Sequence, residues 1–405
     1  MLFFATTINY LDRQVLSMLA KTLETGIGWT SIQYGYITGA FQGAYAIGLL
    51  GGGYLMDRLG TRKGYSIAVS VWSLAAIAHA AATSAFSFGV ARSFLGIGEA
   101  ANFPACIKTV AEWFPKKERA LATGVFNAGT NIGAVVAPLT VPWLAVSFGW
   151  QMAFVATGAL GFVWLIFWLL FYHNPENHPR ISDSELALIQ SDPVERVGGA
   201  PIPWGRLLPR RETWAFIIGK FLTDPVWWFY LFWLPKYLQE KFGLALMQIV
   251  LPTLIVYNAA SIGSIGGGWL SSSLIKSGRS INFARKTAMM ICALCMLPVL
   301  YAPFCTNLWL AVVLISLATS AHQGWSANLF TLSSDMFPRR AIGSVVGVGA
   351  TGGALGGMLM QITTGYVVQR THSYVPLFLF AGLSYIAALG IIHKLSPKLE
   401  TVLLD

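Results

Sequence analysis

The sequence predicts an all-α membrane protein with twelve transmembrane helices in two pseudo-symmetric six-helix halves. Of its 405 residues, 55% are hydrophobic and only 11% are charged, whereas a soluble domain carries about 25% charged residues. The mean hydropathy is +0.60. Twelve apolar stretches can be drawn along the chain, each long enough to cross a bilayer, which takes about 20 helical residues.

Short polar connections separate the expected spans, except at one place. The spans are 2–22, 31–56, 64–83, 85–113, 119–143, 149–172, 213–237, 247–275, 284–303, 307–335, 341–369 and 373–393. The exception is the polar, Pro-containing loop 173–212, with a short helix expected over 182–190. Ser182 is the expected N-cap, and Glu185 follows three residues later. Since the first span opens at Met1 without a polar tail, we expect the natural N-terminus to lie farther upstream.

The long loop divides the chain into an N-terminal six-helix half, 1–172, a cytoplasmic linker, 173–212, and a C-terminal six-helix half, 213–405. Short motifs recur at similar offsets in the two halves. Gly51–Leu55 recurs as Gly266–Leu270, and Trp113–Lys117 recurs as Met336–Arg340. Internal repetition of this kind is typical of secondary transporters, whose substrate site lies between the repeats near the midplane. Glycine is richest in spans 2, 5, 8 and 11, where it lets helices approach closely.

Lysine and arginine lie mainly on one side of the predicted membrane. The even-numbered loops and the C-terminal tail hold 19 of the 27 basic residues, the odd-numbered loops hold 4, and the spans hold 4. The positive-inside rule then places both termini in the cytoplasm. The net charge of +10 is therefore interpreted as a topology signal, and we expect no nucleic-acid partner.

The motifs do not favour other classes of function. No span carries a clustered His/Asp/Glu metal set, and neither G-x-S-x-G nor H-E-x-x-H occurs. Cys292 and Cys295 have redox spacing, but they lie inside an apolar helix, where core packing is favoured. The tail 394–405 is too short for a signalling domain, which argues against a sensor. We expect no enzyme activity, no metal and no cofactor, with the proton as coupling ion.

Four charged residues lie within apolar segments: Asp12 and Arg13 in the first span, and Arg92 and Glu99 in the fourth. A charge at the bilayer centre costs roughly 2.5–3.5 kcal/mol. Arg92 and Glu99 are two helical turns apart and share nearly one face. An arginine fork fits a carboxylate, and a carboxylate in a low-dielectric cavity can exchange protons near neutral pH. The four groups predict a site that binds an anion and carries a proton, or else they pair only to hold helices together.

The first cytoplasmic hairpin, Gly53–Lys63, reads G-x-x-x-D-R-x-G-x-R-K. It resembles the loop signature of the major facilitator superfamily without a mismatch. The repeat copy departs from it, since Ser272 and Ser273 replace the Asp-Arg pair. We expect a cytoplasmic gate in which this hairpin pairs with acids at the ends of the fourth and tenth spans. The predicted gate residues are Asp57, Arg58, Arg62, Glu112 and Asp335.

A narrower resemblance rests on Asn-Tyr-x-Asp-Arg in the first span, Arg-x6-Glu in the fourth and the hairpin. Together these motifs are similar to the anion:cation symporter family, and 221–235 and 322–328 are most similar to its bacterial hexuronate branch. The resemblance implies that Arg13 holds the substrate carboxylate and that Asp12 and Glu99 are the proton-coupled acids. Arg92 would tune Glu99 or contact substrate itself. Further candidate substrate contacts are Tyr10, Tyr45, Gln42, Asn131, Trp227, Tyr230, Gln323, Trp325 and Asn328.

Two further features of the C-terminal half concern the same level of the membrane. His322 occupies the repeat position of Glu99, where a packing role is favoured over titration. Lys220 and Asp224 are four apart and are expected to form an ion pair along one helix.

The family resemblance implies a proton-coupled symporter in the bacterial inner membrane, working by alternating access. Its substrate would be a sugar acid, a hexuronate such as galacturonate or glucuronate. The alternatives keep the fold and change the cargo to galactonate, glucarate, tartrate or an aromatic carboxylate. We expect a monomer whose partners are the lipid bilayer and a small organic anion.

Overall fold

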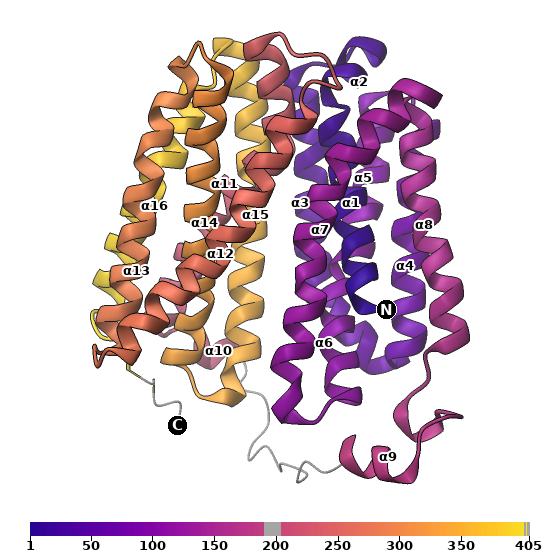
Figure 1. The fold of residues 1–405 in the computed structure, drawn as a ribbon, viewed down its shortest axis with the longest axis vertical. Coiled ribbons are helices and arrows are strands. Elements are labelled where there is room, and N and C mark those ends of the chain that lie inside the picture. Colours follow the sequence, from indigo (N-terminus) through magenta and orange to yellow (C-terminus); the bar gives the residue numbers. More distant parts are fainter. Residues whose placement is uncertain (190–203, 401, 403–405) are drawn as a thin grey trace. The chain divides into compact units, whose positions relative to one another are not determined.

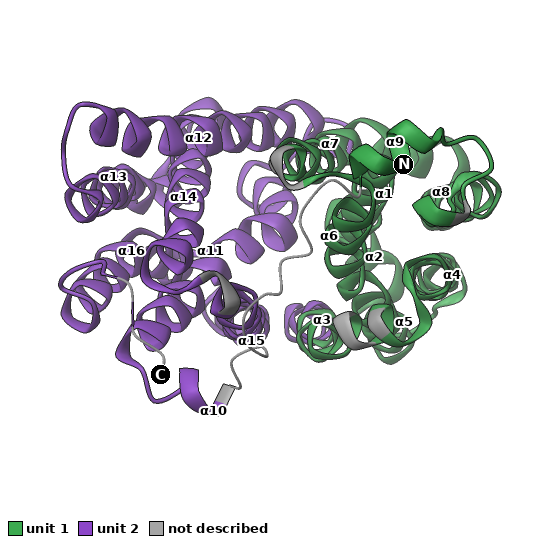
Figure 2. Cartoon of the chain, turned by 90° about the horizontal axis from the view of Figure 1, so that it is seen from below, with its two compact units in different colours: residues 1–29, 40–198 green, residues 30–39, 199–405 purple. Residues whose placement is uncertain are grey.

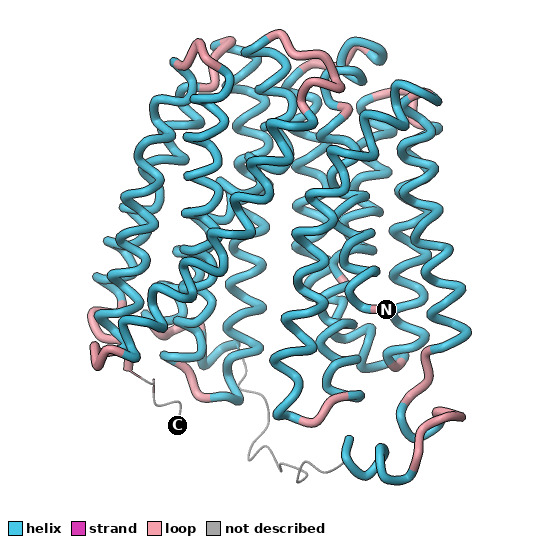
Figure 3. Tube along the Cα trace, viewed as in Figure 1, coloured by secondary structure: helices cyan, strands magenta, loops and turns pink. Residues whose placement is uncertain are grey.

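The computed structural model describes residues 1–189, 204–400 and 402, and these residues form helices joined by loops and turns (Figure 3). The chain forms two compact units: residues 1–29 with 40–198 are unit 1, and residues 30–39 with 199–405 are unit 2 (Figure 2). The helix Ser31–Leu59 therefore contributes its first part to unit 2 and its remainder to unit 1. The division into 1–172, 173–212 and 213–405 stays a prediction, and linker residues 190–203 lie outside the described residues.

Unit 1 contains the first nine α-helices (Figure 1). They are α1 (Leu2–Met18), α2 (Ala20–Ile27), α3 (Ser31–Leu59), α4 (Thr61–Ala78), α5 (Ala85–Ala100), α6 (Asn102–Trp113), α7 (Lys116–Phe148), α8 (Trp150–Phe171) and α9 (Asp183–Ile189). Short 3-10 helices cover His79–Ala81 and Pro175–Asn177. The Ser182 Oγ accepts from the backbone N–H of Glu185 at 3.2 Å, so the predicted cap of the loop helix is confirmed.

Unit 2 contains the remaining helices. They are α10 (Trp204–Leu207), α11 (Arg211–Phe242), α12 (Val250–Lys276), α13 (Ile281–Met296), η3 (Leu297–Phe304), α14 (Leu308–Met336), α15 (Arg339–Thr371) and α16 (Val375–Leu395). Each of the twelve predicted spans is thus helical in the structure. The third and ninth spans end in 3-10 turns, and the first and fourth are each divided into two α-helices, with Leu19 and Ala101 between them.

Eight helices of the described chain are long and apolar enough to cross a membrane by composition alone. They lie within Thr61–Ala81, Leu121–Phe148, Trp150–Phe171, Val250–Lys276, Ile281–Phe304, Leu308–Met336, Ala341–Thr371 and Val375–Leu395. The predicted spans 2–22, 31–56, 85–113 and 213–237 do not meet that test. Three of these four bear charged residues near their middle, so the polar groups that lower their hydropathy are candidates for function.

Glycine allows the closest helix contacts inside each unit. A Cβ built on Gly133 of α7 would lie 2.5 Å from the carbonyl oxygen of Thr7 on α1. In unit 2, a Cβ on Gly267 of α12 would collide with the Cα of Gly324 on α14. These positions accept no larger side chain without separating the helices. Close packing of α1 on α7 fixes the height of Tyr10, whose Cβ faces the same glycine.

Candidate functional site

The charges of the first and fourth predicted spans meet inside unit 1. Nη2 of Arg13 on α1 lies 2.7 Å from Oε2 of Glu99 on α5, and Arg13 Nε donates to the same oxygen at 2.9 Å. Arg13 is 2% exposed and Glu99 is 1% exposed. Such a buried pair is maintained only by good geometry, because desolvation offsets much of its Coulomb attraction. The pairing joins residues that sequence spacing could not connect.

Aromatic rings surround the guanidinium of Arg13. Its Cζ lies 4.5 Å from the ring centroid of Tyr10, 5.0 Å from that of Tyr45 and 5.2 Å from that of Phe41. Arg13 Nη2 also donates to Oδ1 of Asn9 at 3.1 Å, one helical turn earlier. Cation–π contacts are worth up to about 2 kcal/mol when desolvated. The structure thus brings Tyr10 and Tyr45 to the group predicted to hold the substrate carboxylate.

Arg92 and Asp12 lie beside this pair. Arg92 is fully buried, and its Nη2 donates to the backbone carbonyl of Arg13 at 3.3 Å. Asp12 is 2% exposed, and neither carboxylate oxygen receives a hydrogen bond from the described residues. Its polar neighbours are Thr157 on α8 and Glu99 and Arg92 on α5. All four predicted intramembrane charges therefore belong to one cluster in unit 1.

The other candidate contacts of unit 1 are the two amides. Gln42 on α3 is fully buried, and neither Oε1 nor Nε2 has a hydrogen-bond partner among the described residues. Asn131 on α7 is half-buried. The structure does not join either amide to the Arg13–Glu99 pair by a hydrogen bond between described residues, so their part in binding stays a prediction.

In unit 2, an indole and an imidazole lie face to face. The rings of Trp227 on α11 and His322 on α14 stack with centroids 5.4 Å apart and planes 2° apart. His322 is 3% exposed, and its Nδ1 lies 2.5 Å from the hydroxyl of Tyr385 on α16. His322 is thus held between an aromatic face and a hydroxyl. Tyr385 was not singled out by the sequence, because only the packing of α16 brings it here.

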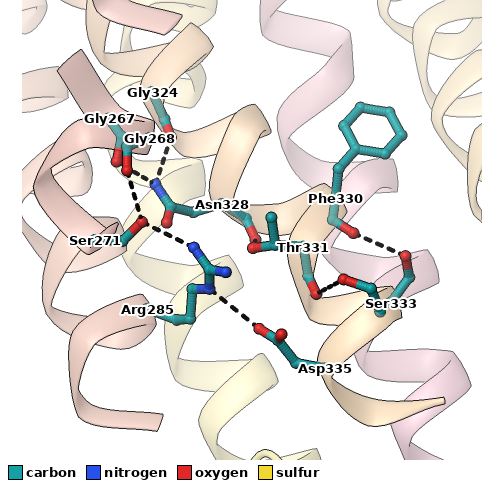
Figure 4. Close-up of polar contacts among 11 residues, drawn as sticks. Gly267, Gly268, Ser271, Arg285, Gly324, Asn328, Phe330, Thr331, Ser333 and Asp335 are labelled. Carbon is teal, nitrogen blue, oxygen red and sulfur yellow. Dashed lines mark hydrogen bonds and ion pairs between the residues drawn. The ribbon is translucent and has the colours of Figure 1, made fainter. Parts of the chain in front are cut away.

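The remaining candidates of unit 2 are more deeply placed. Tyr230 and Trp325 are fully buried, and Gln323 is half-buried. Asn328 is 1% exposed, and its Nδ2 donates to the backbone carbonyls of Gly267 and Gly324, each at 2.9 Å (Figure 4). The amide nitrogen of Asn328 therefore joins α12 to α14. Its role as a substrate contact stays a prediction.

The predicted gate acid Glu112 is bonded at the end of α6 by two hydroxyl groups. Its Oε1 accepts from Thr61 at 2.6 Å and its Oε2 from Tyr172 at 2.6 Å. Burial, with the Glu112 carboxylate beside it, raises the pKa of Tyr172, so this phenol stays protonated and donates. Arg62 donates to the carbonyl of Leu169 at the end of α8. Arg58 is exposed, and the side chain of Asp57 lies outside the described part of the structure.

The other gate acid, Asp335 at the end of α14, pairs within unit 2. Arg285 Nε lies 3.1 Å from Asp335 Oδ2, and Arg285 Nη1 donates to Ser271 Oγ at 2.9 Å (Figure 4). The sequence did not suggest Arg285 as a gate residue, although the repeat could have done so. Thr61 and Arg285 are 224 apart and Glu112 and Asp335 are 223 apart, so each acid contacts the equivalent helix start in its own half.

A family comparison now adds to this geometry. The family model described as Major Facilitator Superfamily matches residues 2–361. The chain belongs to this superfamily. It is 33% identical over 377 residues to a hexuronate transporter of Escherichia coli strain K12, which covers 92% of this chain and 87% of the relative. It is 31% identical over 412 residues to a probable galactarate/D-glucarate transporter of Bacillus subtilis, which covers 96% and 89%.

A solved structure shares the fold. A D-xylose-proton symporter superposes with a TM-score of 0.76 at 16% sequence identity, over 99% of this chain and 98% of that one. The predicted fold class is therefore confirmed: an all-α membrane protein with twelve transmembrane helices in two six-helix halves. The chain is a transporter of the inner membrane and not an enzyme. Within the described residues, no group of three His, Cys, Asp or Glu side chains could hold a metal ion.

Proposed function

We propose that this transporter carries a sugar acid together with a proton by alternating access, and that the sugar acid is a hexuronate such as galacturonate or glucuronate. The observation that carries the proposal is the buried Arg13–Glu99 ion pair, with the Asp12 carboxylate in the same cluster. The names of the relatives support the choice of cargo, since they include hexuronate and aldarate transporters.

The pair supplies a way to couple a proton to an anion. Oε2 of Glu99 receives both contacts from Arg13, so this carboxylate occupies the fork that a substrate carboxylate would need. Protonation of Glu99 removes its charge and leaves the guanidinium to the substrate. The proton and the anion then enter together, and the cluster of charges stays balanced.

Asp12 is the second acid in this proposal. An ionised carboxylate that is buried without a hydrogen bond is costly, and binding a proton removes that cost. Arg92, bonded to the Arg13 carbonyl, holds a permanent charge near both acids. In the cycle, the outward-facing carrier takes up a proton on Asp12 or Glu99, and the sugar acid then docks on Arg13. Neutralisation lets the halves rock, and the higher cytoplasmic pH releases the proton and then the substrate.

The rings around Arg13 suit a sugar acid. Tyr10 and Tyr45 place aromatic faces 4.5 Å and 5.0 Å from its Cζ, and each phenol can also exchange hydrogen bonds with hydroxyls. The same arrangement would accept other organic anions, so galactonate, glucarate, tartrate and aromatic carboxylates stay as alternative cargo. The arginine fork requires a carboxylate in every case.

The test is uptake of labelled galacturonate into proteoliposomes, with and without an inward proton gradient. Gradient-stimulated accumulation that competes with glucuronate, and not with neutral galactose, supports both the class and the Arg13 contact. Uptake that ignores the gradient refutes proton coupling. Absence of uptake refutes the hexuronate assignment, and aldonates, aldarates and aromatic acids are then screened in the same vesicles.

A further inference from the structure

Unit 2 contains an ion pair at the membrane level of the Trp227–His322 stack that the cycle above does not use. Nζ of Lys220 lies 2.8 Å from Oδ2 of Asp224, one turn farther along α11, which confirms the predicted pair. The side chain of Lys220 is 5% exposed and that of Asp224 is 17% exposed. The acid is therefore the more accessible member, and the pair presents its negative end.

The pair continues a line of contacts between α11 and α14. Lys220 Nζ lies 4.1 Å from the ring centroid of Phe330, and two turns farther along α11 Trp227 stacks on His322. The contacting residues ascend on α11 while they descend on α14, so these helices run antiparallel. Asp224 lies between the two contacts, on the same face of α11 as Trp227. The acid and the indole therefore form adjacent parts of one surface.

The other neighbours of the pair add no charge that could replace Lys220. On α15, a Cβ built on Gly353 would collide with the Asp224 carboxylate, and one built on Gly349 would lie 3.3 Å from Lys220 Cδ. Glycine at these two positions leaves the space that the pair fills. On α16, the nearest titratable group is the Tyr385 hydroxyl, which bonds to His322. The charge of Lys220 is thus balanced by Asp224 alone among the described residues of these helices.

We propose that Asp224 makes this transporter selective for sugar acids that carry a single carboxylate. The inference rests on the proposed function, and it names the part of the cargo that unit 2 accepts. A carboxylate accepts hydrogen bonds from sugar hydroxyls, and the Trp227 ring offers a face for the apolar side of a sugar ring. A second substrate carboxylate would instead meet Asp224, a like charge, with the nearby cation already neutralised.

The comparison of galacturonate with galactarate isolates this effect. The two acids share a carbon skeleton, and galactarate differs in that its other end is also a carboxylate. Dissociation constants for both acids are measured by calorimetry on the detergent-purified full chain, so that the readout does not depend on transport. The wild-type protein is expected to bind galacturonate more tightly. In Asp224→Asn, the ratio of the galactarate to the galacturonate constant is expected to fall roughly ten- to a hundred-fold, as removal of a like-charge contact predicts.

A variant of opposite sign keeps the test decisive if Asp224→Asn does not fold. Lys220→Gln removes the cation and leaves the carboxylate, so the same ratio is expected to rise. The double variant Lys220→Gln/Asp224→Asn loses the galactarate affinity gained by Asp224→Asn, and Asp224→Glu retains the wild-type ratio. The matched control is Glu240→Gln, which alters a second Lys–Glu pair of α11, with Lys236 at 3.6 Å, and is expected to leave the ratio unchanged.

The outcomes separate this inference from the proposed function. If the wild-type protein binds galacturonate but the ratio is the same in Asp224→Asn and Lys220→Gln, the selectivity role is overturned and the hexuronate proposal stands. If the wild-type protein prefers galactarate, the selectivity role is overturned and the cargo is an aldarate. If no variant binds either acid, both proposals are overturned.

Discussion

Replacing Arg13 and Glu99 singly and together tests whether the buried pair acts as a unit. The structure gives two charged contacts to one oxygen, at 2.7 Å and 2.9 Å, between side chains that are 2% and 1% exposed. Arg13→Met or Glu99→Leu alone leaves the other charge uncompensated, which costs about 3–5 kcal/mol of unfolding free energy. The double variant Arg13→Met/Glu99→Leu removes both charges from an apolar bundle, so it is expected to lie within about 2 kcal/mol of the wild-type protein.

The assay is equilibrium unfolding in mixed micelles, followed by tryptophan fluorescence. The expected coupling free energy between the two sites is about 3 kcal/mol or more, well above the ~0.5 kcal/mol seen for independent sites. Lys21 and Glu24 serve as the control, because their pair at 3.3 Å is partly exposed and is expected to contribute under about 1 kcal/mol. Additive losses in the double variant would refute the reasoning, since the two charges would then not compensate each other.

Three further outcomes are expected. Asp12→Asn abolishes gradient-driven accumulation in proteoliposomes and spares exchange, because a neutral amide cannot carry the proton; accumulation that survives assigns coupling to another group. Gly133→Leu lowers the unfolding free energy by about 1–3 kcal/mol or more, since its Cβ meets an α1 carbonyl at 2.5 Å; an unchanged unfolding curve contradicts the α1–α7 packing. Asp335→Ala costs about 1–2 kcal/mol by removing the 3.1 Å contact to Arg285, and Arg285→Ala added to it costs little more; fully additive losses in the same unfolding assay would count against the pair.

The sequence by itself determined the class of the molecule. Twelve apolar stretches, an internal repeat and one long loop predict a twelve-helix membrane protein because lipid accepts only backbone that is hydrogen-bonded within its own segment. The same reasoning identified Asp12, Arg13, Arg92 and Glu99 as candidates, since charges in apolar sequence are costly. The pair Lys220–Asp224 was also predictable, because it depends only on the helical period.

Only the tertiary structure decided which charges meet. Arg13 bonds to Glu99 across 86 positions of sequence, Glu112 bonds to Thr61 and Tyr172, and Asp335 bonds to Arg285. Helical periodicity gives the face of a residue but not the neighbour opposite it, because that neighbour depends on how helices distant in the chain pack. The glycines of α7, α12 and α15 set those approaches, and through them the tertiary fold determines which groups form a site.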